Sequence, residues 1–278
     1  MATVDEVKGL VAQMPDPDQR GMYCENIDKA KIDAAIESLR RGGPEFWRAL
    51  TELIVPPGEG DDVKARYALH ALAVAVCKPA GRESRRAFGE TLASLLQSDR
   101  PKAVKTYLCQ QLQTAGGDEA LDALAGLLTD TELCEPAAMA MTAIGRAAGR
   151  LFLAAWPKAV GPCRLTILQN LAVLHVDEAK PIFLAALTDG DREIRLAAGY
   201  GLMKLADPDA VEPLLKAAET DGWERIQATK HCLVLAEKLA AAGKKQPARR
   251  IYEHLKTSRT DPKDAYIRQA AETALATL

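Results

Sequence analysis

The sequence is poor in aromatic residues, which make up 5% of its 278 positions. Its six cysteines are scattered with no Cys-x-x-Cys pair, which disfavours a disulfide framework or a cysteine-based zinc site, so we expect buried free thiols. No apolar run approaches the ~20 residues that a membrane-spanning helix needs. The first ten residues, MATVDEVKGL, lack the basic start and apolar core of a signal peptide. We therefore expect a soluble, cytoplasmic protein.

Catalytic and ligand-binding motifs are also scarce. His70 and Cys77 lie two turns apart on one predicted helix, but two ligands do not make a metal site, and the same spacing suits a packed helix. Gly199 and Gly201 fall inside another predicted helix with no preceding strand, so close helix packing explains them better than a phosphate loop. We expect no catalytic residues, no cofactor and no metal.

What the sequence does contain is a repeated register. In three segments an aspartate is followed four residues later by an arginine, and small and aliphatic residues then recur at helical spacing. The three pairs are Asp62 with Arg66, Asp191 with Arg195, and Asp264 with Arg268. Self-similarity of this kind indicates a helical solenoid.

A second block of 13 residues alternates with the first and occupies residues 118–130, 177–189 and 209–221. Each copy starts with Asp and ends with Thr-Asp. The third, sixth, seventh and tenth positions are apolar, which predicts the buried face of a second helix. The fourth and eighth positions vary, and a surface tuned to a ligand would use them. These positions give five candidate partner-binding residues: Leu121, Lys180, Leu184, Glu212 and Lys216.

These two alternating helices resemble HEAT-type repeats. The DxxIRxxAAxxxL first helix, the Asp-led second helix and a period of about 30 residues look like the short bacterial kind, which is related to the HEAT-like repeats of phycobilin lyases. The resemblance covers about residues 61–278. It implies an all-α, right-handed α–α superhelix of antiparallel helix pairs, with second helices lining a concave side and a role in binding or scaffolding.

Helix starts and breaks give the expected organisation of the chain. Repeats are expected at residues 61–97, 98–130, 131–160, 161–190, 191–221 and 222–257, so residues 61–278 would hold about six helix pairs plus a C-terminal helix. Residues 1–60 differ from the rest. Helices are predicted there over 3–13, 28–41 and 44–55, with breaks at Gly42-Gly43 and Pro56-Pro57. We interpret residues 1–60 as a cap that covers the first repeat.

The Asp–Arg register needs no ligand to explain it. An aspartate at a helix N-cap accepts backbone N–H bonds and contributes about 0.5–2 kcal/mol. An arginine one turn later reaches that carboxylate or the aspartate of the next unit. We therefore expect the three pairs to form a ladder of charges that fixes the stacking of the repeats, in preference to a row of arginines for phosphate.

The three tryptophans are candidate hot spots for binding wherever they are exposed. They are Trp47, Trp156 and Trp223. Each lies at or near a predicted helix end. A place at the edge of the core, with the indole N–H on a carbonyl, is the favoured interpretation.

Two classes of function stay open, and a third is implied by the resemblance. The first is a non-enzymatic scaffold or adaptor that presents a concave helical surface to a protein or peptide. The second is a nucleic-acid-binding protein of the DNA-glycosylase type, although a net charge of −2 argues against it. Its basic run comprises Lys244, Lys245, Arg249, Arg250, Lys256 and Arg259. The third is a lyase-like or sensor protein with a tetrapyrrole-related partner.

Overall fold

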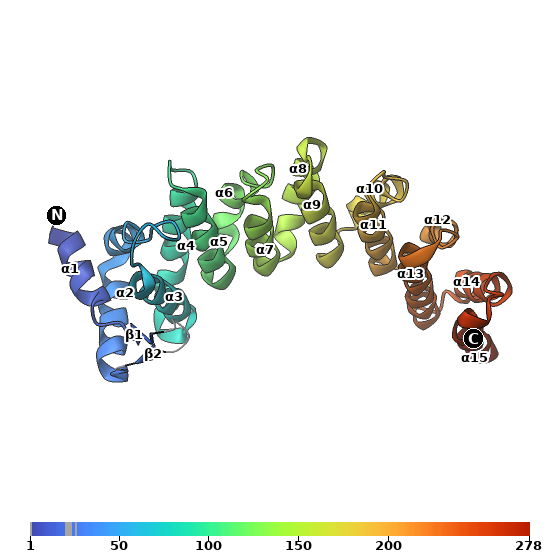
Figure 1. Ribbon diagram of the computed structural model, residues 1–278, viewed down its shortest axis with the longest axis horizontal. Helices are drawn as coiled ribbons and strands as arrows, with labels where there is room; N and C mark the ends of the chain where they lie inside the picture. Colours follow the sequence, from blue (N-terminus) through green and yellow to red (C-terminus); the bar gives the residue numbers. More distant parts are fainter. Residues whose placement is uncertain (1, 20–23, 26) are drawn as a thin grey trace. The chain divides into compact units, whose positions relative to one another are not determined.

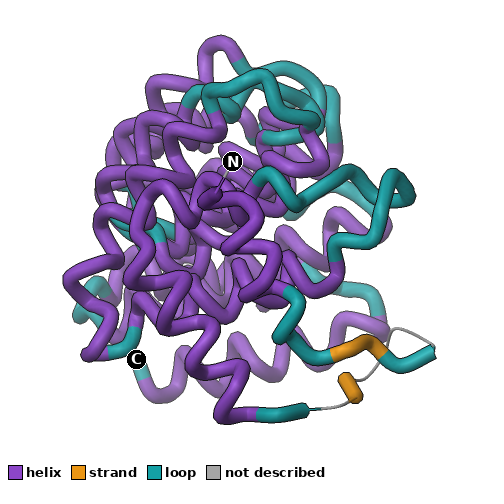
Figure 2. The backbone as a smooth tube through the Cα atoms, turned by 90° about the vertical axis from the view of Figure 1, so that its left-hand side faces the viewer, coloured by secondary structure: helices purple, strands orange, loops and turns teal. Residues whose placement is uncertain are grey.

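The structure, a computed structural model, describes residues 2–19, 24–25 and 27–278. Within these ranges the regular elements are helices, apart from one pair of two-residue strands (Figure 2). The all-α prediction is confirmed. Contacts divide the chain into two units, residues 1–163 and 164–278. The expected grouping into a cap of residues 1–60 and a right-handed superhelix of residues 61–278 stays a prediction.

The N-terminal part of unit 1 contains a long helical element that is interrupted at Gly43. Its elements are α1 (Ala2–Val11), β1 (Asp16–Pro17), β2 (Cys24–Glu25) and α2 (Lys29–Thr51). The strands pair antiparallel. The Asp28 carboxylate caps α2 by accepting from the Lys31 N–H at 3.1 Å. The break expected at Gly42-Gly43 is confirmed, because the backbone of Gly43 is not helical and its φ of +67° favours glycine, so α2 consists of two helical segments that meet at this residue.

The rest of unit 1 consists of helix pairs joined by short turns and 3₁₀ segments. The pairs are α3 (Val63–Cys77) with α4 (Arg82–Leu96), α5 (Lys102–Ala115) with α6 (Leu121–Ala125), and α7 (Cys134–Ile144) with α8 (Gly149–Ala155). First helices pack in series, α3 on α5 and α5 on α7, and second helices do the same, α4 on α6 and α6 on α8. Large side chains such as Phe88, Leu108 and Phe152 are fully buried between them. This stacking is the solenoid arrangement that the repeats predict.

Unit 2 continues the same pattern and ends with a single helix. Its helices are α9 (Pro162–Val173) with α10 (Lys180–Ala186), α11 (Arg192–Leu205) with α12 (Val211–Ala217), α13 (Gly222–Ala241) with α14 (Lys245–Ser258), and α15 (Ala265–Thr277). The second helix α10 packs on α11, and α12 packs on α13. In Figure 1, α10 and α12 lie on the same side of α11 and α13. The two short helices therefore form one face of the unit.

Two glycines allow close packing in unit 2. A Cβ at Gly201 would come within 2.5 Å of the ring of Phe183, which is fully buried. A Cβ at Gly199 would come within 2.9 Å of the Nδ1 atom of His231. The packing role expected for these glycines is confirmed, because the neighbouring rings occupy the space that a side chain would need.

The cysteines are free thiols that differ in burial. Cys109, Cys134, Cys163 and Cys232 are buried, as expected, whereas Cys24 and Cys77 are exposed. Burial raises the pKa of the Cys109 thiol to about 12. It therefore stays protonated and unreactive near neutral pH.

Candidate functional site

The ladder expected from the Asp–Arg register is replaced by a different set of bonds. Of the three Asp–Arg pairs of the register, only Asp62 and Arg66 bind each other, with Oδ2 and Nη2 2.8 Å apart. Burial of the Asp62 carboxyl raises its pKa, but hydrogen bonds from Arg66 and from the Val55 N–H outweigh this and lower the pKa below its usual value. The expected ion pair is therefore present here and absent from the other two pairs, whereas the expected helix cap is made by Asp191 and not by Asp62 or Asp264.

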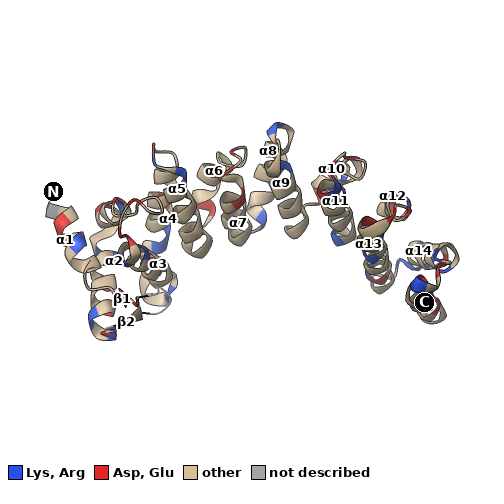
Figure 3. Cartoon of the chain, viewed as in Figure 1, with Lys and Arg blue, Asp and Glu red and all other residues tan. Residues whose placement is uncertain are grey.

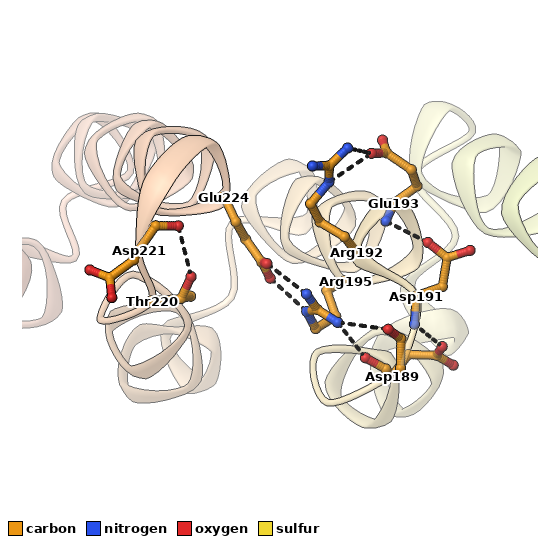
Figure 4. Close-up of polar contacts among 9 residues, drawn as sticks. Asp189, Asp191, Arg192, Glu193, Arg195, Thr220, Asp221 and Glu224 are labelled. Carbon is orange, nitrogen blue, oxygen red and sulfur yellow. Dashed lines mark hydrogen bonds and ion pairs between the residues drawn. The ribbon is translucent and has the colours of Figure 1, made fainter.

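Arg195 pairs with a glutamate of the next repeat instead of with Asp191. Its Nε and Nη2 atoms each lie 2.6 Å from an oxygen of Glu224 on α13, and Nη1 donates to the Asp189 carbonyl at 2.7 Å (Figure 4). The hydrogen bond from Arg195 lowers the pKa of Glu224, and the same bond raises the pKa of Arg195. Asp191 is occupied locally, since it accepts from the Glu193 N–H at 2.8 Å as the cap of α11.

The third pair is also separated. Asp264 contacts Arg225 of α13. Arg268 donates to two backbone carbonyls, those of Arg259 and Asp261, the second at 2.9 Å. The cause is the 3₁₀ turn Pro262–Asp264, which ends at the aspartate and leaves carbonyls of the preceding loop within reach of the arginine. These charges hold repeats and turns together and do not form a continuous ladder.

The Thr-Asp end of the second block lies in the turn before the next helix. The carboxylates of Asp130 and Asp189 each accept a backbone N–H two residues later, at 2.9 Å. The third copy differs, because the side chain of Asp221 makes no such cap and Gly222 follows with a φ of +66°. Two of the three copies therefore use the aspartate as a turn residue.

The largest cavity among those described in unit 2 is a groove of about 650 Å³ between α10 and α12. We call it the α10–α12 groove. It is lined by Leu184, Leu187, Thr188, Arg195, Glu212, Pro213, Lys216, Ala217, Thr220 and Glu224. Three of the five candidate partner-binding residues, Leu184, Glu212 and Lys216, therefore lie in one cavity.

The lining of the α10–α12 groove combines apolar contact area with charges that are mostly paired. Its apolar part comes from Leu184 and Leu187, in and just after α10, and from Pro213 and Ala217 of α12. Arg195 and Glu224 bind each other. Glu212 accepts two bonds from Arg250 of α14, at 2.7 and 2.9 Å.

The other two candidates lie outside the groove and are corrected by the structure. Leu121 is the first residue of α6 and is 3% exposed, because α6 packs against α4, α7 and α8. Lys180 uses its Nζ atom to bind Asp207 and Asp209 of the next repeat, at 2.7 Å each. The hydrogen bond from Lys180 lowers the pKa of Asp207. Leu121 is a core residue, and Lys180 connects two repeats.

Seven of the ten residues that line the groove were not among the partner-binding candidates from the sequence. The missed residues are Leu187, Thr188, Pro213, Ala217 and Thr220, besides the Arg195–Glu224 pair. A signal for them was present. The first five occupy block positions that lie beside the fourth and eighth on the same helix surface or one turn beyond them.

The tryptophans separate into core and surface. Trp47 is 1% exposed, donates its indole N–H to the Leu39 carbonyl at 2.9 Å and packs edge-on against Phe88, so it is not a hot spot. Trp156 is half-buried. Trp223 is 57% exposed and lines a second cavity of about 540 Å³ together with Tyr200 and His231. Of the three, Trp223 best fits the expectation of a hot spot.

Half of the basic run near the C-terminus is neutralised or buried. Arg259 is 3% exposed and donates to the Ala218 carbonyl at 2.7 Å. Arg250 is bound to Glu212, and Lys256 lies 3.5 Å from Glu272. Figure 3 shows acidic and basic residues interspersed through α10–α14. Of the run, Lys244, Lys245 and Arg249 are exposed and have no ion pair among the described residues, and Lys245 donates to the Leu278 carbonyl at 2.6 Å.

The described residues hold no cluster of three or more potential metal ligands. The two residues considered for a metal have other neighbours. The Nδ1 atom of His70 lies 3.0 Å from Oε1 of Gln111, and the Cys77 thiol donates to the Thr114 carbonyl at 3.4 Å. In the part of the chain that the structure describes, no helix is both long and apolar enough to cross a membrane.

The region that contains the groove matches a known family of repeats. Residues 161–233 match the family model for HEAT repeats. This segment is therefore similar to HEAT repeats. The match runs from α9 into α13 and contains every residue that lines the α10–α12 groove. The resemblance to HEAT repeats is therefore confirmed for this segment, and the groove lies between the second helices of two successive repeats in it.

Solved structures with a similar backbone share little sequence with this chain. One is an engineered protein with a TM-score of 0.47 and 18% identity, over 99% of this chain and 77% of that one. Another is human deoxyhypusine hydroxylase in complex with glycerol, with a TM-score of 0.34 and 20% identity, over 99% and 96% of the two chains. A search of proteins with curated descriptions gives no match.

Proposed function

We propose that this chain is a non-enzymatic scaffold whose α10–α12 groove binds a segment of a protein partner. The observation that supports the proposal is the position of Leu184, Glu212 and Lys216. They vary in kind within regular repeats, and all three line one groove of about 650 Å³. This volume is typical of ligand-holding clefts. In a repeat protein, faithful positions build the stack and variable surface positions select the partner.

The chemistry of the groove favours binding over catalysis. No histidine or cysteine is among its lining residues. The hydroxyls of Thr188 and Thr220 donate to backbone carbonyls. A general acid or base needs a pKa near the working pH, whereas the bond from Arg195 lowers the pKa of Glu224 and keeps it ionised. The lining residues therefore supply contact area and fixed charge. A cytoplasmic location is part of the same proposal.

Nucleic-acid binding through α14 has less support. Phosphate contacts need lysines and arginines that are free to replace counterions. Arg250 and Lys256 already contact carboxylates, and Arg259 is buried. If the chain bound nucleic acid, it would do so with the three exposed residues Lys244, Lys245 and Arg249, and retention of the chain on DNA cellulose at ~0.15 M salt would reveal it.

Site-specific photocrosslinking in the source organism tests the proposal. A photoreactive amino acid replaces Leu184 in the full chain, and the control replaces Met139, an exposed residue of α7 far from the groove in sequence. We expect covalent adducts with one protein or a few proteins at position 184 and not at position 139. Identical adducts at both positions, or none at position 184, would contradict the proposal.

A further inference from the structure

Four charged side chains line the α10–α12 groove, and three of them already have partners. Arg195 and Glu224 bind each other, with side chains 27% and 15% exposed. Glu212 is bound by Arg250, which approaches from α14 and contacts both carboxylate oxygens. Lys216 is the exception. It is exposed and has no hydrogen bond or ion pair among the described residues. The uncompensated charge of the groove is therefore a single positive one.

Lys216 lies where a segment bound in the groove would cover its ammonium group. The residue follows Glu212 by one helical turn on α12 and lines the same cavity as the apolar side chains of Leu184 and Pro213. A segment that covers these apolar side chains also removes water from around the ammonium group. Taking a charge out of water without a counter-charge is unfavourable. A carboxylate on the segment removes this penalty.

A basic segment has no equivalent partner. The carboxylates of Glu212 and Glu224 are both engaged by arginines, so a lysine or arginine of the segment would compete with an existing two-bond contact. It would also approach Lys216. Like charges brought together at an interface are unfavourable. Charge complementarity therefore favours acid over base.

We propose that the α10–α12 groove binds an acidic aliphatic segment of a partner protein. Its aliphatic side chains contact Leu184, Leu187 and Pro213, and an aspartate or glutamate pairs with Lys216. This inference rests on the proposed function and narrows it from a protein segment to one of stated charge and side-chain type. The Arg250–Glu212 contact keeps the acidic residue of the groove itself from repelling the partner.

Selection from a displayed library of random peptides of about 16 residues tests the inference. The full chain is the target, and enriched peptides are then measured against variants by fluorescence anisotropy. We expect enriched peptides to carry a net negative charge and several Leu, Ile or Val residues. Lys216→Glu should weaken their binding roughly threefold to tenfold. Lys230→Glu makes the same change of charge on α13 beside His231, outside the groove, and should leave binding unchanged.

Two further variants separate the local charge from a general effect of net charge. Arg250→Gln leaves Glu212 without its partner, so binding of the acidic peptides should weaken. Glu212→Gln leaves Arg250 without its partner, so binding should strengthen. The side chains of Arg250 and Glu212 are 48% and 65% exposed, so neither substitution should disturb folding, and a folding defect would not produce opposite effects on binding.

The outcomes distinguish the inference from the proposed function. Peptides that need Leu184 but are neutral or basic, and that ignore Lys216→Glu, would overturn the acidic preference and leave the scaffold proposal standing. A selection in which no enriched peptide depends on Leu184 would contradict both. Circular dichroism of each variant confirms that the chain is folded before binding is compared.

Discussion

Arg195 of α11 and Glu224 of α13 join two successive repeats through two hydrogen bonds of 2.6 Å each (Figure 4). The same guanidinium donates to the Asp189 carbonyl at 2.7 Å, so it also holds the turn before α11. Both side chains line the α10–α12 groove. A single charged pair therefore connects the stacking of two successive repeats to the wall of the proposed binding surface.

Removal of one charge of this pair should destabilise unit 2. Glu224→Gln leaves a partly buried Arg195 without its counter-charge, and we expect a loss of about 1–3 kcal/mol in the free energy of unfolding. Urea denaturation followed by circular dichroism measures it. The matched control is Arg192→Gln, which removes an exposed pair with Glu193 and should cost no more than about 0.5 kcal/mol. Equal losses in the two variants would contradict the structural role.

Two glycine-to-alanine substitutions should change the stability of the chain in opposite directions. Alanine at position 201 places its Cβ against the buried ring of Phe183, which outweighs its better helix propensity, and we expect a loss of about 1–3 kcal/mol. Alanine at Gly9 in α1 meets nothing within 4 Å and should stabilise by up to about 1 kcal/mol. Thermal unfolding of both variants gives the comparison. A stabilising Gly201→Ala would show that the α10–α11 contact is looser than described.

The buried and exposed tryptophans should respond differently to the same substitution. Trp47→Phe removes the N–H donor to the Leu39 carbonyl and leaves space beside Phe88, so we expect a loss of about 2 kcal/mol or more. Trp223→Phe should change stability by less than about 0.5 kcal/mol, because its side chain is mostly in solvent. Chemical denaturation of the two variants measures both. A large loss from Trp223→Phe would place that residue in the core.

His231 should make stability depend on pH above the range in which carboxylates titrate. Burial lowers its pKa from 6.5 to about 4, and the charge of Lys230 adds to this effect. The unfolded chain takes up a proton below pH 6.5 while the folded chain does not until about pH 4. The free energy of unfolding therefore falls as pH is lowered through this window.

The comparison that isolates His231 uses two variants. When the pH is lowered from 7 to 5, the free energy of unfolding of His231→Gln should fall by about 2 kcal/mol less than that of the natural chain. His70→Gln, which replaces an exposed histidine, should show the same fall in the free energy of unfolding between pH 7 and pH 5 as the natural chain. His254 also has a lowered pKa through burial and contributes with the same sign in all three proteins. A natural chain and a His231→Gln variant with the same pH slope would contradict the burial.

The helices were predictable because burial repeats with the period of the helix. Ile194, Ala198 and Leu202 recur on one face of α11 in the sequence and are buried in the structure. The partner of Arg195 was not predictable in this way. Both Asp191 and Glu224 lie within reach of a long, flexible side chain, and the choice depends on the spacing of two helices that are far apart in sequence.

The groove was predictable in part for a similar reason. The fourth and eighth block positions lie on the exposed side of α12, so Glu212 and Lys216 were found. The same position in α6 belongs to Leu121, which is covered by neighbouring helices that the block alone does not describe. Burial of a surface position depends on what packs beside it, and a pattern within one helix contains no information about that neighbour.

The most direct test of the scaffold proposal is the affinity of a protein captured at position 184 for the full chain and its variants. Isothermal titration calorimetry gives the Kd. We predict that Leu184→Asp raises Kd roughly tenfold or more, since it places a charge in the apolar contact, and that Met139→Asp leaves Kd unchanged. A Kd that is the same for the natural chain and for Leu184→Asp would contradict binding in the α10–α12 groove.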